Sequence, residues 1–250
     1  MMFKTLIIIL LSFGMREAEC AENNFINVVE KVSYSTVAIA LHSPLKHSAP
    51  KIMGTGFAVQ DGSIVITNYH VVSEILDPTV VEHFVVLTGE GKNVKALKAT
   101  IDKIDPKNDL AALKIEGVVS PLVLGEDELR KPGTSIAFTG FPIGAVLGLF
   151  PATHTGIVAA ITPDAIPVMN SVQLSTKMLS RLDDLSLIYQ LDATAFPGNS
   201  GSPMYDPLTG HVIGVINKVL VKDTLESALS NPSGISYAIP VVKVRNLLQQ

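Results

Sequence analysis

The sequence has no tryptophan and a single cysteine, Cys20. A lone cysteine cannot form an intramolecular disulfide, and it cannot supply the cysteine pairs of a structural zinc site. The six histidines are scattered along the chain without the spacing of metal ligands. These absences argue against a disulfide scaffold and against a structural metal centre.

An excess of charge of either sign is also missing. Lys and Arg number 19 and Asp and Glu number 23, which gives a net charge of −4. This balance argues against nucleic acid or an anionic membrane surface as the main partner. Aliphatic and small residues dominate instead, which suits a β-rich core, and 250 residues are enough for one large unit or two small ones.

The first twenty residues have the layout of a secretory signal peptide. Lys4 supplies a short positive region, residues 6–15 are apolar, and residues 18–20, Ala-Glu-Cys, resemble a cleavage site. The apolar run is too short to span a bilayer comfortably, and a membrane-anchoring helix is the alternative. We expect residues 1–20 to be removed and residues 21–250 to form an exported domain, periplasmic or secreted, without stable membrane insertion.

The most informative segment is residues 196–203, Phe-Pro-Gly-Asn-Ser-Gly-Ser-Pro. Its glycines allow backbone angles closed to other residues, and its prolines fix theirs. Such a turn can expose the hydroxyl of Ser200 and aim successive N–H groups at one point. An acyl-transfer enzyme needs positive dipoles at that point, because the attacked carbonyl oxygen becomes an anion. A serine nucleophile also needs a histidine base and an acid.

A candidate base follows a predicted hairpin. Residues 54–59 form a strand that begins at a glycine, Asp61-Gly62 is a hairpin signal, and residues 63–67 form the returning strand. His70 comes just after that strand, and a rigid strand followed by a turn fixes a side chain well. Because histidine exchanges protons near neutral pH, His70 is the predicted general base. A structural histidine that caps the strand end is the alternative.

The candidate acid is Asp109, which opens an apolar strand after a turn that contains proline. An acid at the mouth of a strand, facing a buried histidine, can hold the imidazole in one tautomer and stabilise its cation. Asp102 and Asp105 are the competing acids. Each lies in a more polar setting, and neither leads into an apolar strand.

The order His70, Asp109, Ser200 is that of chymotrypsin-type proteases, and it differs from the order in subtilisins and α/β-hydrolases. The segments around these residues resemble those of the HtrA/Deg branch of trypsin-like serine proteases. The resembling segments are spread along most of the mature chain: residues 54–57 (GTGF), 67–72 (TNYHVV), 108–111 (NDLA), 155–158 (TGIV), 192–193 (DA) with 198–203 (GNSGSP), and 237–240 (YAIP).

This resemblance implies an all-β fold of two six-stranded antiparallel barrels, at about residues 36–119 and 133–240, with the active site in the cleft between them. Short helices are expected at residues 23–35 and 241–248. The resemblance also implies an oxyanion hole made by the backbone N–H groups of Gly198 and Ser200.

By the same resemblance, two walls line the primary specificity pocket: Thr194, Ala195 and Phe196 on one side, and Ile216, Asn217 and Lys218 on the other. No acid stands at Thr194, so small or medium aliphatic side chains are favoured over Lys or Arg. An acidic substrate side chain, attracted by Lys218, is the alternative, since the Gly-Asn-Ser-Gly-Ser-Pro motif also occurs in glutamyl endopeptidases.

The chain departs from the family pattern at several places. Ser202 stands where most HtrA proteins and trypsins have a second glycine. Asn199 stands where trypsins have an acid that pairs with a new N-terminus, so no zymogen cleavage is expected. Residues 162–188 are longer than the corresponding HtrA connection; a helical insert packed on the second barrel is favoured over a mobile loop that borders the cleft. We expect no PDZ domain, because the sequence up to Gln250 leaves no room for one.

The sequence thus predicts a serine endopeptidase that hydrolyses extended or unfolded polypeptides through a Ser-His-Asp acyl-enzyme mechanism, with no metal or organic cofactor and no nucleic acid partner. A catalytically silent binding module of the same fold and an esterase-like hydrolase are the alternatives. HtrA proteases often trimerise through N-terminal contacts, but a helix such as 23–35 more often packs on its own barrel. His154 is expected at the surface, without a role.

Overall fold

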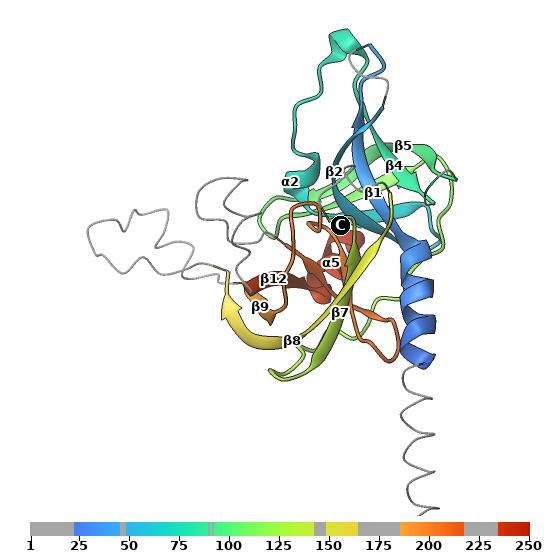
Figure 1. Cartoon of the computed structure of the whole chain (residues 1–250). Coiled ribbons are helices and arrows are strands. Elements are labelled where there is room, and N and C mark those ends of the chain that lie inside the picture. The colour runs from blue at the N-terminus through green and yellow to red at the C-terminus, as the bar shows by residue number, and fades with distance from the viewer. Residues whose placement is uncertain are drawn as a thin grey trace, which may run out of the picture.

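The computed structural model describes residues 23–45, 49–89, 91, 93–142, 149–164, 186–217 and 235–250. These residues form two closed six-stranded antiparallel β-barrels, one from each half of the chain (Figure 1). The expected all-β fold of two barrels is therefore confirmed. The predicted signal peptide lies outside the described residues.

The first barrel closes in the order β1-β2-β3-β6-β5-β4. Its strands are β1 (Thr36–His42), β2 (Lys51–Val59), β3 (Ile64–Thr67), β4 (His83–Thr88), β5 (Lys95–Asp105) and β6 (Leu110–Ile115). Alternation along β1 serves two cores, because successive side chains of a strand point to opposite faces. Val37 and Ile39 enter the interior of this barrel, whereas Ala38 and Ala40 pack against Phe141 from the second half of the chain.

The second barrel closes in the order β10-β11-β12-β9-β8-β7. Its strands are β7 (Ser135–Gly140), β8 (Ala152–Pro163), β9 (Leu187–Asp192), β10 (Pro203–Tyr205), β11 (Val212–Ile216) and β12 (Ile235–Pro240). The three-residue strand β10 completes the ring by pairing with β11 and with β7. Closure of both rings removes the sheet edges that would otherwise invite pairing with another chain.

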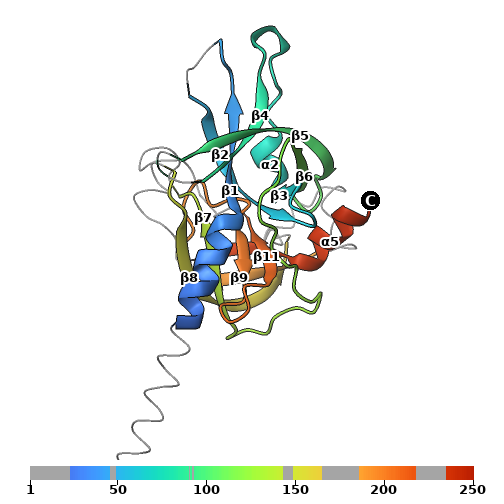
Figure 2. The ribbon, with the colours of Figure 1, turned by 90° about the vertical axis from the view of Figure 1, so that its right-hand side faces the viewer.

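A shared hydrophobic core joins the two barrels. Phe57 and Leu110 of the first barrel meet Tyr205 and Val215 of the second in one buried cluster. The helix over residues 23–35 leads directly into β1 and contributes to this cluster. The C-terminal helix α5 (Val241–Gln249) contributes as well, and lies beside β11 and the first barrel (Figure 2). Both expected terminal helices are present, and the first packs on the chain's own barrels.

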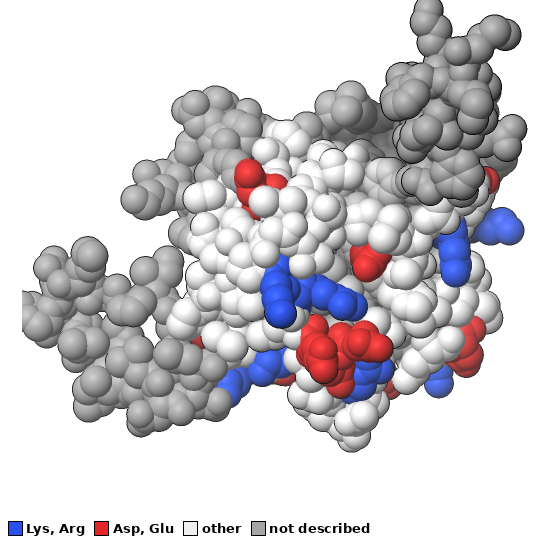
Figure 3. All heavy atoms as spheres, turned by 90° about the horizontal axis from the view of Figure 1, so that it is seen from below, with Lys and Arg blue, Asp and Glu red and all other residues white. Residues whose placement is uncertain are grey.

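Two short helical segments lie between β3 and β4. They are α2 (Tyr69–Val72) and the 3₁₀ turn η1 (Pro78–Val80). In the described part of the chain, no helix is long and apolar enough to cross a membrane. On the face shown in Figure 3, basic and acidic side chains lie beside one another within a mostly uncharged surface.

Candidate active site

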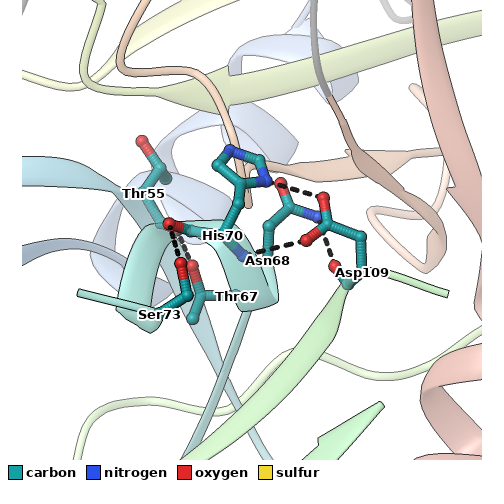
Figure 4. A network of polar contacts seen from close by, with 6 residues as sticks. All are labelled: Thr55, Thr67, Asn68, His70, Ser73 and Asp109. Atoms are coloured by element: carbon teal, nitrogen blue, oxygen red, sulfur yellow. Dashed lines mark hydrogen bonds and ion pairs between the residues drawn. The ribbon is translucent and has the colours of Figure 1, made fainter. Parts of the chain in front are cut away.

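His70 lies in α2, the single helical turn that follows β3, and it contacts Asp109 twice (Figure 4). One carboxylate oxygen, Oδ2, lies 2.6 Å from His70 Nδ1, and the other, Oδ1, accepts the backbone N–H of His70 at 2.8 Å. An ionised carboxylate only accepts hydrogen bonds, so Nδ1 carries the proton in this arrangement. In the neutral imidazole, the opposite nitrogen, Nε2, then carries no proton and is able to accept one.

Asp109 is held by its backbone as well as by its side chain. Its carbonyl oxygen accepts from Asn68 Nδ2 at 3.0 Å and from the Tyr69 backbone N–H at 3.1 Å. Asp109 has a left-handed φ of 51°, a conformation that Asp tolerates better than most residues. These two bonds hold the backbone of Asp109 against the segment that joins β3 to α2, which orients the carboxylate toward α2.

The two competing acids are placed differently. Asp105 caps the turn that leads to β6, because its carboxylate accepts from both the backbone N–H and the side-chain amide of Asn108. Asp102 is exposed on β5. Of the three acids considered, Asp109 is the one whose carboxylate contacts His70.

Most backbone N–H groups of the serine turn form hydrogen bonds to backbone carbonyls. From residue 198 to residue 202, three N–H groups donate to backbone carbonyls: Asn199 to Phe196 at 3.0 Å, Gly201 to Ile216 at 2.9 Å, and Ser202 to Asn199 at 3.0 Å. The N–H groups of Gly198 and Ser200 have no partner among the described residues. Gly198 has a φ of 100° behind Pro197, as in a type II turn. The turn that carries Ser200 therefore has two unpaired donors, the N–H of Ser200 itself and that of Gly198 two residues earlier.

Backbone and side-chain hydrogen bonds tie this turn to the first barrel. Ser200 O accepts from the backbone N–H of Thr55 at 2.9 Å, and Thr55 O in turn accepts from Thr67 Oγ1 at 2.7 Å. Thr67 ends β3, three residues before His70. The serine turn is therefore bonded to β2, the neighbour of the strand β3 that leads to His70. In the described part of the chain, Ser200 Oγ makes no hydrogen bond to His70, and such bonds are often long before substrate binds.

The residues predicted to line the specificity pocket have mixed surroundings. Ala195 and Ile216 are buried in the core of the second barrel. Thr194 and Phe196 are partly buried, and Asn217 donates its backbone N–H to Tyr237 O at 2.8 Å. Lys218 lies outside the described residues. Their roles toward substrate stay predictions.

The long segment at 162–188 is described only at its two ends. Its first residues complete β8 and its last begin β9, and Asp164 N donates to Ser186 O at 2.9 Å where the two strands meet. The predicted helical insert lies outside the described residues.

The expectation that His154 is a surface residue is wrong. β8 begins at Ala152, so His154 lies within the strand and its ring stacks on Phe138 at a centroid distance of 4.9 Å. It also packs 5.9 Å from Phe196. Burial lowers the pKa of His154 below its ordinary value, which keeps the ring neutral. The sequence signal missed was the alternation that extends the strand toward residue 152.

Thr55 is a site residue that the sequence did not single out. Its segment, Gly-Thr-Gly-Phe, was noted as a family feature, but no role was attached to the hydroxyl. Thr55 Oγ1 donates to Gly198 O at 2.7 Å. A threonine in a strand has many ordinary uses, and only the folded arrangement shows this contact. Within the described ranges, no group of three or more His, Cys, Asp or Glu side chains could hold a metal ion.

Comparison with known proteins agrees with this geometry. A family model for the trypsin-like peptidase domain matches residues 54–215. The chain belongs to this family. Its trypsin-like domain is similar to those of HtrA and Deg proteases.

Among curated relatives, the trypsin-like domain is 32% identical over 234 residues to serine protease HTRA1 of Xenopus tropicalis, covering 91% of this chain and 43% of that protein. It is 34% identical over 233 residues to serine protease HTRA4 of Homo sapiens, covering 91% and 41%. A probable periplasmic serine endoprotease DegP-like of Marinomonas sp. is 29% identical over 209 residues, covering 83% and 37%. The chain thus spans less than half the length of these relatives.

Solved structures share the same architecture. The crystal structure of Deg5 has a TM-score of 0.62 and 27% identity, covering 90% of this chain and 92% of that chain. The active form of the Rv3671c protease from M. tuberculosis has a TM-score of 0.64 at 23% identity, covering 89% and 82%, and it supports the trypsin-like fold alone.

Proposed function

We propose that this trypsin-like domain is a serine endopeptidase in which Ser200 is the nucleophile, His70 the general base and Asp109 the residue that orients His70. The observation that carries the proposal is the pair of unpaired N–H groups at Gly198 and Ser200, in a turn tied to the barrel wall that bears the His70–Asp109 pair. Unpaired backbone donors in the turn that carries a nucleophilic serine are what a developing oxyanion requires.

The reaction begins when Ser200 Oγ attacks the carbonyl carbon of a peptide bond. His70 Nε2 takes the serine proton, while Asp109 Oδ2 accepts from Nδ1 and stabilises the imidazolium. The negative charge on the carbonyl oxygen is then held by the N–H groups of Gly198 and Ser200. His70 returns the proton to the leaving amine as the C–N bond breaks, which leaves an acyl-enzyme on Ser200.

A water molecule completes the cycle. His70 Nε2 takes a proton from water, the hydroxide attacks the acyl carbon, and the same two N–H groups hold the second oxyanion. The ester bond breaks, and Ser200 Oγ recovers its proton from His70. No metal or organic cofactor enters any of these steps.

The substrate we propose is an extended segment of a polypeptide, laid in the cleft between the two barrels, as the family resemblance implies. One relative is named a probable periplasmic serine endoprotease, and this name supports a polypeptide as the substrate. Together with the predicted signal peptide, it also supports export from the cytoplasm. The preferred side chain in the substrate is expected to be small or aliphatic, as the absence of an acid at Thr194 implies.

The test compares the wild-type chain with Ser200→Ala on unfolded casein and with a fluorophosphonate probe. We expect the wild type alone to cleave casein and to be labelled at Ser200. Labelling without peptide hydrolysis, but with rapid ester hydrolysis, would favour an esterase. A folded wild type that is neither labelled nor active would leave the silent binding module and refute the proposal.

A further inference from the structure

Thr55 uses its hydroxyl and its backbone N–H to hold the second half of the chain against the first. Its hydroxyl Oγ1 donates to Gly198 O at 2.7 Å and accepts the backbone N–H of Phe141 at 3.0 Å. Its backbone N–H donates to Ser200 O at 2.9 Å, and its carbonyl accepts from Thr67 Oγ1 at 2.7 Å. A single residue of β2 therefore forms hydrogen bonds to the serine turn at Gly198 and at Ser200, the residues before and after Asn199.

The grip on Gly198 concerns the residue with the most conformational freedom in the turn. Gly198 has a φ of 100°, and glycine can adopt many other backbone angles at little cost. The peptide that precedes Gly198 carries the unpaired N–H, and the peptide that follows carries the carbonyl that Thr55 Oγ1 binds. The Asn199 N–H of that second peptide donates to Phe196 O. The hydroxyl therefore restrains the rotation that would turn the Gly198 N–H away from its present direction.

The side chains of the serine turn itself do not supply such a restraint. The side-chain amide of Asn199 and the hydroxyl of Ser202 are buried and have no partner among the described residues. Neither side chain therefore anchors the turn. Thr55 Oγ1 is the one side-chain group in the described part of the chain that binds a backbone group of residues 198–202.

We propose that Thr55 is a positioning residue for the oxyanion site: its hydroxyl fixes the Gly198–Asn199 peptide and so aims the Gly198 N–H. The inference rests on the proposed serine endopeptidase function. Thr55 acts through Gly198 and does not touch the substrate. Its effect falls on the transition state, in which the oxyanion is charged, more than on the ground-state substrate, whose carbonyl is neutral.

The kinetic test uses three variants of the full chain. Thr55→Val removes the hydroxyl and keeps the shape, and Thr55→Ser keeps the hydroxyl. Thr36→Val is the matched control, because Thr36 is a buried threonine of the same barrel whose hydroxyl donates to Val32 O at 2.8 Å, away from the serine turn. Thermal melting of all three shows whether each variant is folded.

Loss of a whole oxyanion donor costs about 10²–10³ in kcat, so a misaimed donor in Thr55→Val is expected to cost about tenfold or more, with KM changed less than about twofold. Affinity for a peptide aldehyde should fall by a similar factor, because its adduct with Ser200 places an oxyanion at the same N–H groups. Thr55→Ser and Thr36→Val should keep kcat near that of the wild type. Equal kcat for Thr55→Val and Thr36→Val, or no rescue by Thr55→Ser, overturns the inference.

A second readout does not depend on turnover. Gly198-Asn199 is the only Gly-Asn step in the sequence, so labelling glycine carbonyls with ¹³C and asparagine nitrogens with ¹⁵N yields one correlated signal from this peptide. Thr55→Val should shift that signal, and Thr36→Val should not. If the wild type shows no turnover that depends on Ser200, the proposed function fails, while the shift still decides whether Thr55 fixes the peptide. An unmoved signal in Thr55→Val refutes the positioning role.

Discussion

Replacing Asp109 with asparagine should lower kcat about 10⁴-fold while the chain stays folded. The two carboxylate oxygens of Asp109 accept two different N–H groups of His70, from Nδ1 at 2.6 Å and from the backbone at 2.8 Å. An amide has one acceptor oxygen and one NH₂ donor. The backbone N–H cannot move its proton, so it keeps the oxygen, and the NH₂ then faces Nδ1.

The imidazole must answer by moving its proton to Nε2. That tautomer cannot accept the proton of Ser200, so the base is lost although the ring stays in place. A 10⁴-fold fall in kcat corresponds to about 5.4 kcal/mol of transition-state stabilisation, at about 1.36 kcal/mol per factor of ten. The two hydrogen bonds at one carboxylate therefore decide between an active and an inactive histidine.

The assay measures initial rates on a peptide substrate, with thermal melting to show that the variant is folded. Asp102→Asn is the matched control, because Asp102 is an exposed acid on β5 that was also a candidate on sequence grounds. Its kcat should stay within about twofold of the wild type. A fall of less than tenfold in Asp109→Asn, or an equal fall in the two variants, would refute the assignment of Asp109.

Three further predictions concern stability. A methyl on Gly201, which has a φ of 88°, would lie 2.1 Å from Thr55 O, so Gly201→Ala should lower the free energy of unfolding by about 3 kcal/mol or more in urea titrations. Tyr205→Phe loses a buried hydroxyl 2.9 Å from Thr139 Oγ1 and should cost about 1 kcal/mol in the same assay; no change would contradict this bond. Burial lowers the pKa of His154 from its ordinary 6.5, so the unfolded chain binds the proton first as pH falls. Stability should therefore decline below about pH 6.5, by less than about 1.4 kcal/mol per pH unit for this partly screened ring, and His154→Gln should show a shallower decline than the wild type.

The family resemblance predicted the two barrels, and the strands located from local sequence lie close to the observed ones. β3 begins one residue after the start of the predicted strand at 63–67 and ends with it at Thr67. β2 begins earlier, at Lys51, because Ile52 pairs with Ala40 of β1 across the hairpin. That pairing adds residues 51–53 to the strand, and it comes from a neighbouring strand that the local sequence does not reveal.

At the candidate site, the order of the residues along the chain and the motifs around them pointed to His70, Asp109 and the serine turn. What they could not give is backbone conformation and long-range contact. Neither the left-handed φ of Asp109 nor the bond from Thr55 to Gly198, which spans 143 positions, follows from local composition. His154 was misplaced for the same reason, since its stacking partner Phe138 lies on another strand.

The division of the site between two barrels has a consequence during synthesis. The first barrel contains His70 and Asp109, and Ser200 belongs to the second. In the proposed mechanism, a folding chain can therefore bring its base and acid together before its nucleophile is in place. Because the serine turn is tied to Thr55, hydrolytic activity should appear only when the two halves have docked. Recovery of activity on refolding should therefore report that docking step directly.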